Sequence, residues 1–329
     1  MPDRVPVVIR GTSSTALGAR HETGALIREA LPGSDVANLQ ARIGIATRYW
    51  LTPEETAATL GAAALEGALA AAGCTARDLQ RIIFVSSTGG DWLIPATAND
   101  VAALCGCDDT CDAFDVNNSC AGFVTALDLA TRSIATGMNL VAVVAAETFS
   151  RYLSPAMPRP YLVLGDAAGA VILGRGRERE EGGVLATWLR NSSALRGQMS
   201  TPHPGLSRQP ELIRFAASTP ELVSSALEAI RTSAAAVLSQ AGLTWADVDW
   251  FLPHQPNGEM LRLIAESFPG GRERMMPVVE ELGSVGAASI PFSLDRLLRT
   301  RRPRPRDRIL MVGFGSGTAY GAALYQVAP

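Results

Sequence analysis

The sequence predicts an α/β fold made of two similar halves. Apolar segments of strand length alternate with longer helical patterns along the chain, which is typical of layered α/β proteins. Residues 72–84 and 241–253 share one pattern, in which a helix ends at glycine, a Thr/Asp turn follows and an apolar strand comes next. The halves also close alike, at Gly169–Leu173 and Gly321–Tyr325. Two repeats in the same order indicate a duplicated unit.

A Gly/Arg/Glu-rich segment at residues 174–183 separates the repeats, so we expect one domain at residues 1–174 and a second at residues 175–329. Apolar residues make up 47% of the 329-residue chain and charged residues 19%, the balance of a globular protein. A net charge of −3 favours neither nucleic acid nor an anionic membrane as partner. No apolar run approaches the roughly 18 residues of a membrane span, and the N-terminus lacks a signal-peptide pattern, so we expect a cytoplasmic protein.

Each element can be placed from its local pattern. Thr52 followed by Pro53 predicts a helix that begins with Thr52 as its N-cap and ends at Gly73. The other expected elements are strands at Val5–Ile9, Arg81–Ser86, Leu140–Ala146 and Ala167–Leu173, and helices at Pro95–Leu104, Gly258–Phe268 and Phe292–Leu298.

Three of the five cysteines crowd together at Cys105, Cys107 and Cys111, and the chain's three histidines are scattered. Zinc sites use four ligands with paired spacing, which this arrangement lacks. We therefore expect no metal site and reduced thiols.

The stretch Asp115–Ala130 is the strongest candidate for a functional site. A strand-like approach turns into a helical pattern that stops at Gly137. Ser119 is the expected N-cap, which places Cys120 in the first turn, where the helix dipole would stabilise a nucleophilic thiolate. A small buried cysteine packed under a helix is the alternative.

Three later features bear on chemistry. His254 directly follows an apolar strand, where the first half has Val85, and catalytic groups gather at such strand ends. A hydrogen-bonded structural histidine is the alternative reading. Gly313–Gly321 is weak as a dinucleotide motif because no helix follows, but it could bring backbone N–H groups to a reacting carbonyl oxygen. Gly283–Pro291 is a small-residue turn.

Together these segments resemble the ketoacyl synthase III branch of the thiolase-like condensing enzymes. The resemblance spans nearly the whole chain and rests on five pieces in the family's order: DVNNSCAGF, LGDAAGAVIL, PHQPN, GSVGAASIP and GFGSGTAYGAAL. It implies a thiolase-like fold, a duplicated five-layer αβαβα arrangement, usually found as a homodimer. Ile94 matches a residue that usually reaches toward the partner subunit.

The resemblance implies that Cys120 takes an acyl group from a coenzyme A or acyl carrier protein thioester and that His254 activates the thiol or stabilises the next transition state. The backbone N–H groups of Cys120 and Ser316 would form the oxyanion hole. No permanently bound cofactor is implied, because the coenzyme A or phosphopantetheine thioester is the substrate. Near the tunnel mouth the family places its nucleotide and phosphate contacts at Arg42 and Arg159, and Asn257 belongs with them.

Three positions depart from the family pattern. Ser284 stands where the family has an Asn that, with the His, donates hydrogen bonds to the malonyl thioester oxygen as carbon dioxide leaves. Loss of one such donor typically costs about 3–4 kcal/mol. Asn38 replaces a Trp that stacks on adenine, and Glu259 replaces a cation, which together suggest a different donor or weaker coenzyme A binding.

The leading hypothesis is therefore an acyltransferase of specialised metabolism that loads an acyl group on Cys120 and passes it to an oxygen, nitrogen or carbon nucleophile. The alternative is a decarboxylating 3-oxoacyl-acyl-carrier-protein synthase III; simple thioester hydrolysis and a non-catalytic subunit of a heterodimer are further possibilities. The basic stretch Arg299–Arg308 could dock an acidic carrier protein. A solvated loop is the better interpretation of that stretch.

Overall fold

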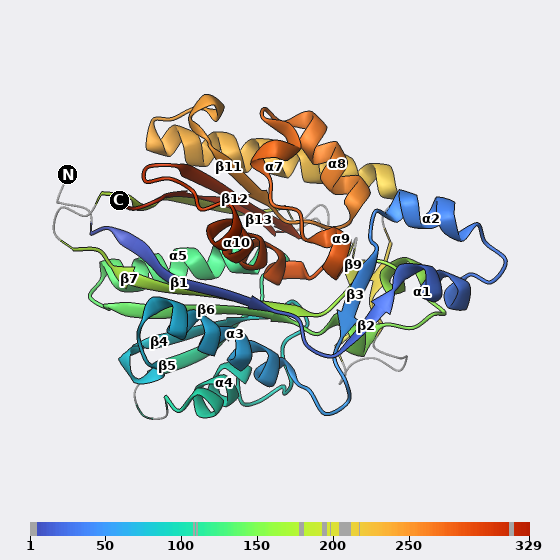
Figure 1. The fold of residues 1–329 in the computed structure, drawn as a ribbon, viewed down its shortest axis with the longest axis horizontal. Helices are drawn as coiled ribbons and strands as arrows, with labels where there is room; N and C mark the ends of the chain where they lie inside the picture. Colours follow the sequence, from blue (N-terminus) through green and yellow to red (C-terminus); the bar gives the residue numbers. More distant parts are fainter. Residues whose placement is uncertain are drawn as a thin grey trace.

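The structure is a computed structural model that describes residues 5–107, 109, 111–177, 181–192, 196, 197, 199–203, 212–216, 218–315 and 319–329. Two mixed sheets alternate with three layers of helices, as Figure 1 shows, so the predicted five-layer α/β arrangement is confirmed. Helices α3 and α4 cover the outer face of the first sheet, α5 and α10 lie between the sheets, and α7 and α8 cover the second sheet.

The first sheet has the order β1-β7-β6-β4-β5, in which β4 runs parallel to both β5 and β6. Its strands are β1 (Val7–Thr15), β4 (Arg81–Val85), β5 (Asp112–Val116), β6 (Leu140–Glu147) and β7 (Ala167–Arg175). The second sheet has the order β11-β12-β13-β8. Its strands are β8 (Gly183–Asn191), β11 (Trp250–Pro253), β12 (Arg308–Gly315) and β13 (Ala319–Gln326).

The long helices are amphipathic or small-residue helices packed on these sheets. They are α3 (Ala57–Ala72), α4 (Thr97–Cys105), α5 (Gly122–Ala135), α7 (Thr219–Ala241), α8 (Gly258–Ser267) and α10 (Ser289–Thr300). A side region beside the sheets holds β2 (Ala19–Glu22), α1 (Thr23–Ala30), α2 (Val36–Ile43) and β3 (Thr47–Trp50). Shorter elements are α6 (Pro158–Tyr161), β9 (Met199–Ser200), β10 (Arg214–Phe215) and α9 (Val279–Leu282).

The internal repeat is confirmed in detail. Helices α3 and α7 both end at a left-handed glycine, with φ of 66° at Gly73 and 68° at Gly242. A short 3₁₀ turn follows each glycine, and each turn carries the same Thr/Asp capping box before β4 or β11 begins. Only glycine adopts this φ without a steric penalty, so the pattern was readable in the sequence.

The predicted start of α3 at Thr52 is wrong. Residues Thr52–Glu55 form a separate turn, closed by the Thr52 N–H donating to the Glu55 carboxylate at 2.8 Å. The helix begins after Thr56, which forms a reciprocal cap with Thr59. Asp91, distant in sequence, accepts hydrogen bonds from the first two helical N–H groups, and such long-range capping leaves no local signal.

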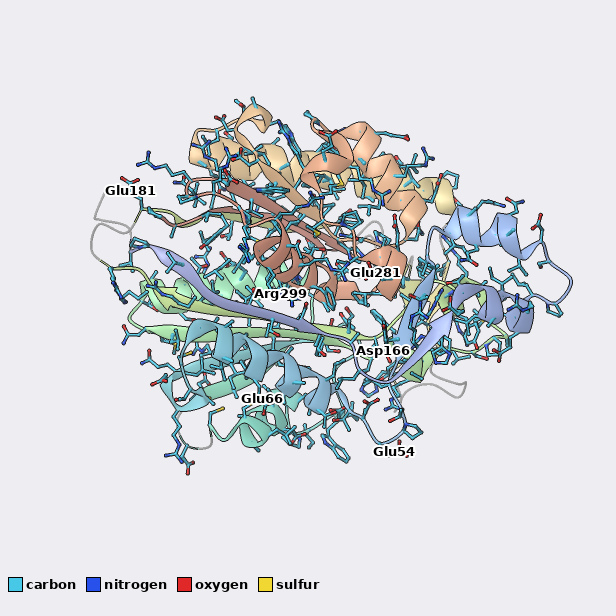
Figure 2. All side chains as sticks on the ribbon, viewed as in Figure 1. Glu54, Glu66, Asp166, Glu181, Glu281 and Arg299 are labelled. Atoms are coloured by element: carbon cyan, nitrogen blue, oxygen red, sulfur yellow. The ribbon has the colours of Figure 1, made fainter. Side chains whose placement is uncertain are left out.

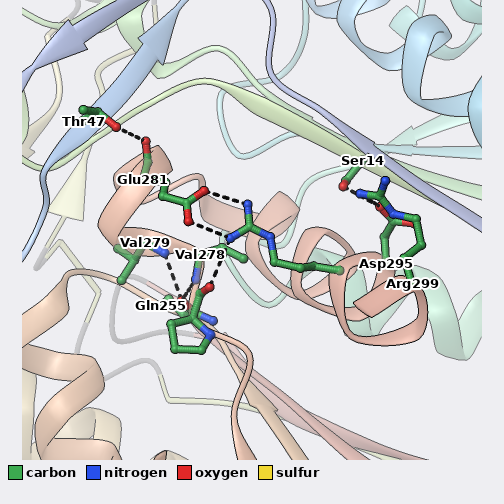
Figure 3. A network of polar contacts seen from close by, with 10 residues as sticks. Ser14, Thr47, Gln255, Val278, Val279, Glu281, Asp295 and Arg299 are labelled. Carbon is green, nitrogen blue, oxygen red and sulfur yellow. Dashed lines mark hydrogen bonds and ion pairs between the residues drawn. The ribbon is translucent and has the colours of Figure 1, made fainter. Parts of the chain in front are cut away.

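The two halves share one interior. A single core cluster takes buried side chains from β4, β6, β7 and α5 of the first half and from α10, β11, β12 and β13 of the second. The Asp295 carboxylate of α10 adds a polar tie, because it accepts hydrogen bonds from Thr12 (2.9 Å) and Ser14 (2.6 Å) of β1 and pairs with Arg299 (Figure 3). The domain boundary at 174/175 therefore stays a prediction.

We expect the Asp295→Ala substitution to lower the free energy of unfolding by about 2–4 kcal/mol, because it removes a buried charged acceptor and leaves two hydroxyl groups without it. The matched control is Glu281→Ala, which removes an exposed pair with Arg296 and should cost less than about 1 kcal/mol. Urea unfolding of both variants measures the difference. Equal losses would show that Asp295 does not tie the halves together.

Candidate active site

Cys120 lies in the tight connection between β5 and α5, and its side chain is buried. The helix begins at Gly122 with Ala121 as its N-cap, so the predicted capping role of Ser119 is wrong. Ser119 instead takes a left-handed conformation with φ of 50°, which turns the chain so that Cys120 precedes the helix rather than joining its first turn. A positive φ at a non-glycine residue is uncommon and often marks a functional turn.

Strand β12 of the second half packs directly under this connection. A Cβ added at Gly315 would lie 2.6 Å from the Cys120 backbone nitrogen, and one at Gly313 would lie 2.9 Å from the Ala121 Cα. These distances are shorter than any stable contact, so glycine is required for the two backbones to approach. The closeness explains the small residues of the Gly-rich closing segment.

His254 stands beside the same strand. It follows β11, which runs parallel to β12, and its backbone N–H donates to the Val312 carbonyl at 2.8 Å. The first half brings Cys120 onto β12 and the second half brings His254 alongside it. Both residues line one cavity, as the strand-end argument predicts.

The surroundings of the His254 ring fix its tautomer. Nδ1 lies 2.9 Å from Ser289 Oγ, and the Ser289 hydroxyl donates its one proton to the Gly286 carbonyl at 2.9 Å. Nδ1 must then carry the proton and donate to Ser289, which leaves the Nε2 lone pair free to accept. Burial lowers the pKa of His254 to about 3, against a smaller raising effect of the Gly286 backbone, so the ring is neutral near pH 7.

The shared cavity has a volume of about 300 Å³. Cys120, His254 and Ser284 meet in it, and Arg159 and Asn257 also line it. Most of the remaining wall is apolar, which suits an acyl chain or a pantetheine arm better than a free nucleotide. The apolar wall includes Phe149, Leu164, Met199, Phe215, Leu222, Met260 and Phe314.

Ser284, which the resemblance predicts at the position of the family Asn, is buried. Its backbone forms a bridge with the chain around Leu164: the Ser284 N–H donates to the Val163 carbonyl at 2.8 Å, and the Gly165 N–H donates to the Ser284 carbonyl at 3.1 Å. Within the described part of the chain no hydrogen bond of its hydroxyl is found, so the hydroxyl is available to a bound substrate.

The expected nucleotide contacts divide into two groups. Asn257 caps α8 by accepting from the Met260 N–H at 2.7 Å, and Arg159 lies over the Phe215 ring at 4.9 Å, both at the cavity wall. Arg42 is exposed at the end of α2 and does not line the cavity. It lies near Glu259, whose pKa is lowered chiefly by hydrogen bonds from Arg262 and less by Arg42. Ser316 lies outside the described residues.

The predicted thiolate stabilisation at Cys120 is also wrong. Burial raises the pKa of the Cys120 thiol to about 12, and the nearby Glu147 carboxylate adds to the rise. The resting site is therefore a neutral thiol beside a neutral imidazole, and a nucleophile forms only when the proton moves to the base.

Glu147 and Ser289 were missed by sequence reasoning. Glu147 ends the buried strand β6 and is itself fully buried, and Ser289 opens α10 beside His254. A sequence signal for Glu147 existed: an acidic residue directly follows seven apolar residues, at the strand end where site groups gather. The role of Ser289 depends on a contact across 35 residues and has no sequence signal.

Comparison with known proteins identifies the family to which this chain belongs. Residues 114–193 match the 3-oxoacyl-(acyl-carrier-protein) synthase III family, and residues 238–327 match its C-terminal part. A beta-ketoacyl-(acyl-carrier-protein) synthase III 3 of Streptomyces coelicolor is 35% identical, covering 96% of each chain. The chain belongs to the 3-oxoacyl-acyl-carrier-protein synthase III family. It is thus a transferase of the thiolase-like condensing enzymes.

Other members of this family agree. A beta-ketoacyl-(acyl-carrier-protein) synthase III of Rhizorhabdus wittichii is 34% identical, covering 96% of this chain and 98% of the relative. The crystal structure of the Pseudomonas aeruginosa 3-oxoacyl-(acyl carrier protein) synthase III superposes with a TM-score of 0.88 at 30% identity, covering 98% of this chain and 99% of the other.

The basic stretch Arg299–Arg308 lies away from the cavity. It connects α10 to the start of β12, whereas Cys120 packs at the far end of that strand, roughly 23 Å away at the usual strand rise. Arg306 pairs with Glu181, which Figure 2 shows at the edge of the molecule near the chain termini. The position favours the solvated-loop interpretation.

In the described part of the chain, none of the helices is both long and apolar enough to cross a membrane. Within the same residues, His, Cys, Asp and Glu side chains form no group of three or more that could hold a metal ion.

We expect ¹⁵N NMR of His254 to show the Nδ1–H tautomer and no protonation from pH 8 down to about pH 4, because burial lowers the pKa to about 3. The chain has only three histidines, so a His254→Gln variant identifies the signal. An Nε2–H tautomer, or a titration near pH 6.5, would contradict the assignment.

A Gly315→Ala substitution should slow acylation of Cys120 by about 100- to 1,000-fold, the usual effect of losing an oxyanion donor, because its Cβ would displace the Cys120 N–H. Gly24→Ala is the control, since Gly24 lies in helix α1 without a positive φ and a Cβ there comes no nearer than 3.3 Å to side-chain atoms of Gln40 and Val36, which can adjust. Burst-phase acylation measures the effect. An unchanged burst in Gly315→Ala would show that this N–H takes no part.

Proposed function

We propose that the protein is an acyltransferase that forms an acyl-Cys120 thioester and passes the acyl group to an oxygen, nitrogen or carbon nucleophile. One observation carries the proposal: a thiol and a proton-accepting His254 Nε2 share a cavity with Ser284 in place of a longer amide side chain. The nucleophile and the base are therefore retained, whereas the pair of donors expected for a developing enolate is not.

In the first step Cys120 Sγ attacks the thioester carbonyl carbon while its proton moves to His254 Nε2. The Cys120 backbone N–H, held against Gly315, donates to the carbonyl oxygen as it becomes negative, and the Ser316 N–H is the proposed second donor. The carbon–sulfur bond to the donor then breaks, and the departing thiolate takes the proton from the His254 imidazolium. The products are acyl-Cys120 and a free coenzyme A or phosphopantetheine thiol.

In the second step an acceptor attacks the acyl-Cys120 carbonyl and gives its proton to His254 Nε2. The bond to Cys120 breaks, and the imidazolium returns the proton to the thiolate. The unprotonated Nε2 can accept this proton, but a pKa of about 3 makes the resting imidazole a weak base, so the imidazolium depends on the negative charge that develops beside it in the transition state. The same ring donates poorly to an enolate oxygen, since Nε2 lacks a proton.

The donor is a coenzyme A or carrier-bound phosphopantetheine thioester, and no permanently bound cofactor takes part. The apolar cavity wall supports this assignment. Arg159 and Asn257 line the same cavity, and we propose that Arg159 meets a phosphate group and Asn257 the pantetheine amides. Arg42 would contact the nucleotide end only outside the cavity. Its neighbour Glu259, acidic and paired with Arg262, weakens that contact.

We also propose a homodimer. Trp92, Leu93 and Ile94 form one loop whose side chains are 62%, 71% and 86% exposed. Three consecutive large apolar side chains in water are unfavourable, and such patches mark protein interfaces. A second copy of the chain would cover these side chains. This agrees with the family resemblance, in which the residue matching Ile94 usually reaches toward the partner subunit.

The second candidate is a decarboxylating 3-oxoacyl-acyl-carrier-protein synthase III. The names of the relatives at 34–35% identity favour it. It requires Ser284 or a water molecule to replace the missing amide donor.

The Ser284→Asn substitution separates the two candidates. If the protein transfers acyl groups without decarboxylation, Asn restores the missing donor and should raise carbon dioxide release from a malonyl thioester by about 100-fold or more. Acyl transfer to a panel of primary alcohols and amines should change little. Carbon dioxide release and acceptor acylation are measured on the same preparations.

Ser192→Asn is the control, because Ser192 also lines the cavity but does not correspond to the family Asn. Rapid condensation by the unmodified protein, with no gain in Ser284→Asn, would establish the decarboxylating synthase instead.

A further inference from the structure

Glu147 is a buried carboxylate that holds the two halves together beside the nucleophile. It ends β6 and is fully buried. Its Oε1 accepts from the Ser87 hydroxyl at 2.6 Å and from the Ala287 N–H at 2.9 Å, and its Oε2 accepts from the Ser87 N–H at 3.0 Å. Ser87 follows β4 in the first half, whereas Ala287 belongs to the second.

The short loop that contains Ala287 connects Glu147 to His254 through a series of contacts. A Cβ at Gly286 would lie 2.6 Å from Glu147 Oε1, so the glycine, with φ of 48°, allows the loop to close over the carboxylate. The Gly286 carbonyl accepts from Ser289, and Ser289 accepts from His254 Nδ1. Ser284 lies two residues before Gly286. Glu147 therefore anchors the loop that orients the base and presents Ser284.

The charge of Glu147 acts on Cys120 without a balancing cation. In the described residues no Arg or Lys pairs with the carboxylate. The titratable groups coupled to it by charge are Cys120 and Asp166, which directly precedes β7. Burial raises the pKa of Glu147 to about 7, with hydrogen bonds from Ser87 and Ala287 opposing the rise, and its carboxylate in turn raises the pKa of Cys120.

We infer that Glu147 is a positioning residue of the acyl-transfer site: it anchors the 284–289 loop, which presents Ser284 and, through Ser289, orients His254. This role goes beyond the proposed function, because no step of the acyl transfer assigns a part to Glu147. A secondary effect supports it: the carboxylate opposes the Cys120 thiolate only while it is ionised.

The direction of the pH effect follows from the charge of Glu147 on either side of its pKa. Below about pH 7 Glu147 is protonated and neutral, so the thiol ionises with less opposition. Above about pH 7 the carboxylate is charged and disfavours the thiolate. The alkylation rate of Cys120 should therefore rise less than tenfold per pH unit around pH 7.

The test is iodoacetamide alkylation of Cys120 between pH 6 and pH 9, followed by mass spectrometry of the Cys120 peptide. In Glu147→Gln the charge is gone, so alkylation at pH 8 should be several times faster than in the unmodified protein, because the thiolate no longer faces a carboxylate. At pH 6 the two rates should agree, because both side chains are neutral. A rate ratio that is the same at every pH would overturn the charge effect of Glu147 on Cys120.

The anchoring role is tested by acyl transfer. Gln offers one acceptor oxygen where the carboxylate meets three donors, so Glu147→Gln should transfer more slowly although its thiol reacts faster. Glu147→Asp keeps the charge but shortens the side chain, so its alkylation profile should match the unmodified protein while transfer still slows. Parallel losses of alkylation and transfer in both variants would indicate general disruption and would overturn the assignment.

Asp115→Asn is the matched control. Asp115 is also a partly buried carboxylate that accepts two backbone N–H bonds, from Thr97 and Ala98, but it lies outside the cavity wall. It should leave the alkylation profile unchanged. Alkylation needs no acyl donor, so a failed acyl-transfer proposal and a failed role for Glu147 give different results.

Discussion

The close packing of the Cys120 connection on strand β12 is the contact on which the site depends. Gly313 and Gly315 allow the two backbones to approach to a distance that any side chain would prevent. Because β11 is the parallel neighbour of β12, the same strand sets the distance between Cys120 of one half and His254 of the other. The duplicated fold thus assembles its site at the seam between its halves, in the shared core rather than in a loop on the surface.

The electrostatics of the site favour the neutral form of the Cys120 thiol. Burial disfavours the thiolate at Cys120 and the imidazolium at His254, and the Glu147 carboxylate strengthens the first effect. The resting pair near pH 7 is therefore a thiol and a neutral imidazole, and in the proposed acyl transfer the proton moves as the sulfur attacks the thioester carbonyl. Such a site suppresses alkylation and oxidation of Cys120 between turnovers, because the thiolate is the reactive form.

Much of the fold could be predicted from the sequence because the local sequence signals and the tertiary structure agree. The left-handed glycines Gly73 and Gly242, with the Thr/Asp turns after them, are local signals, and they located the repeat correctly. The starts of α3 and α5 were misplaced because their geometry is set from elsewhere. Asp91 caps α3 over a long sequence distance, and the positive φ of Ser119 is imposed by packing on β12.

The candidate site likewise has a part that the sequence predicts and a part that it does not. Cys120, His254 and Ser284 were found through motif order and strand-end logic, and the cavity joins them. The pKa shifts could not be foreseen, because they depend on burial and on Glu147, which approaches Cys120 only in the folded chain. The tautomer of His254 likewise depends on Ser289, whose contact exists only after α10 packs against β11.

The most direct test of acyl transfer without decarboxylation is intact-protein mass spectrometry after incubation with malonyl-coenzyme A, alongside Cys120→Ala. We expect a malonyl adduct that keeps its carboxylate and is absent from the variant. An acetyl adduct from the same donor would show that decarboxylation proceeds with Ser284 in place, and it would contradict acyl transfer without decarboxylation.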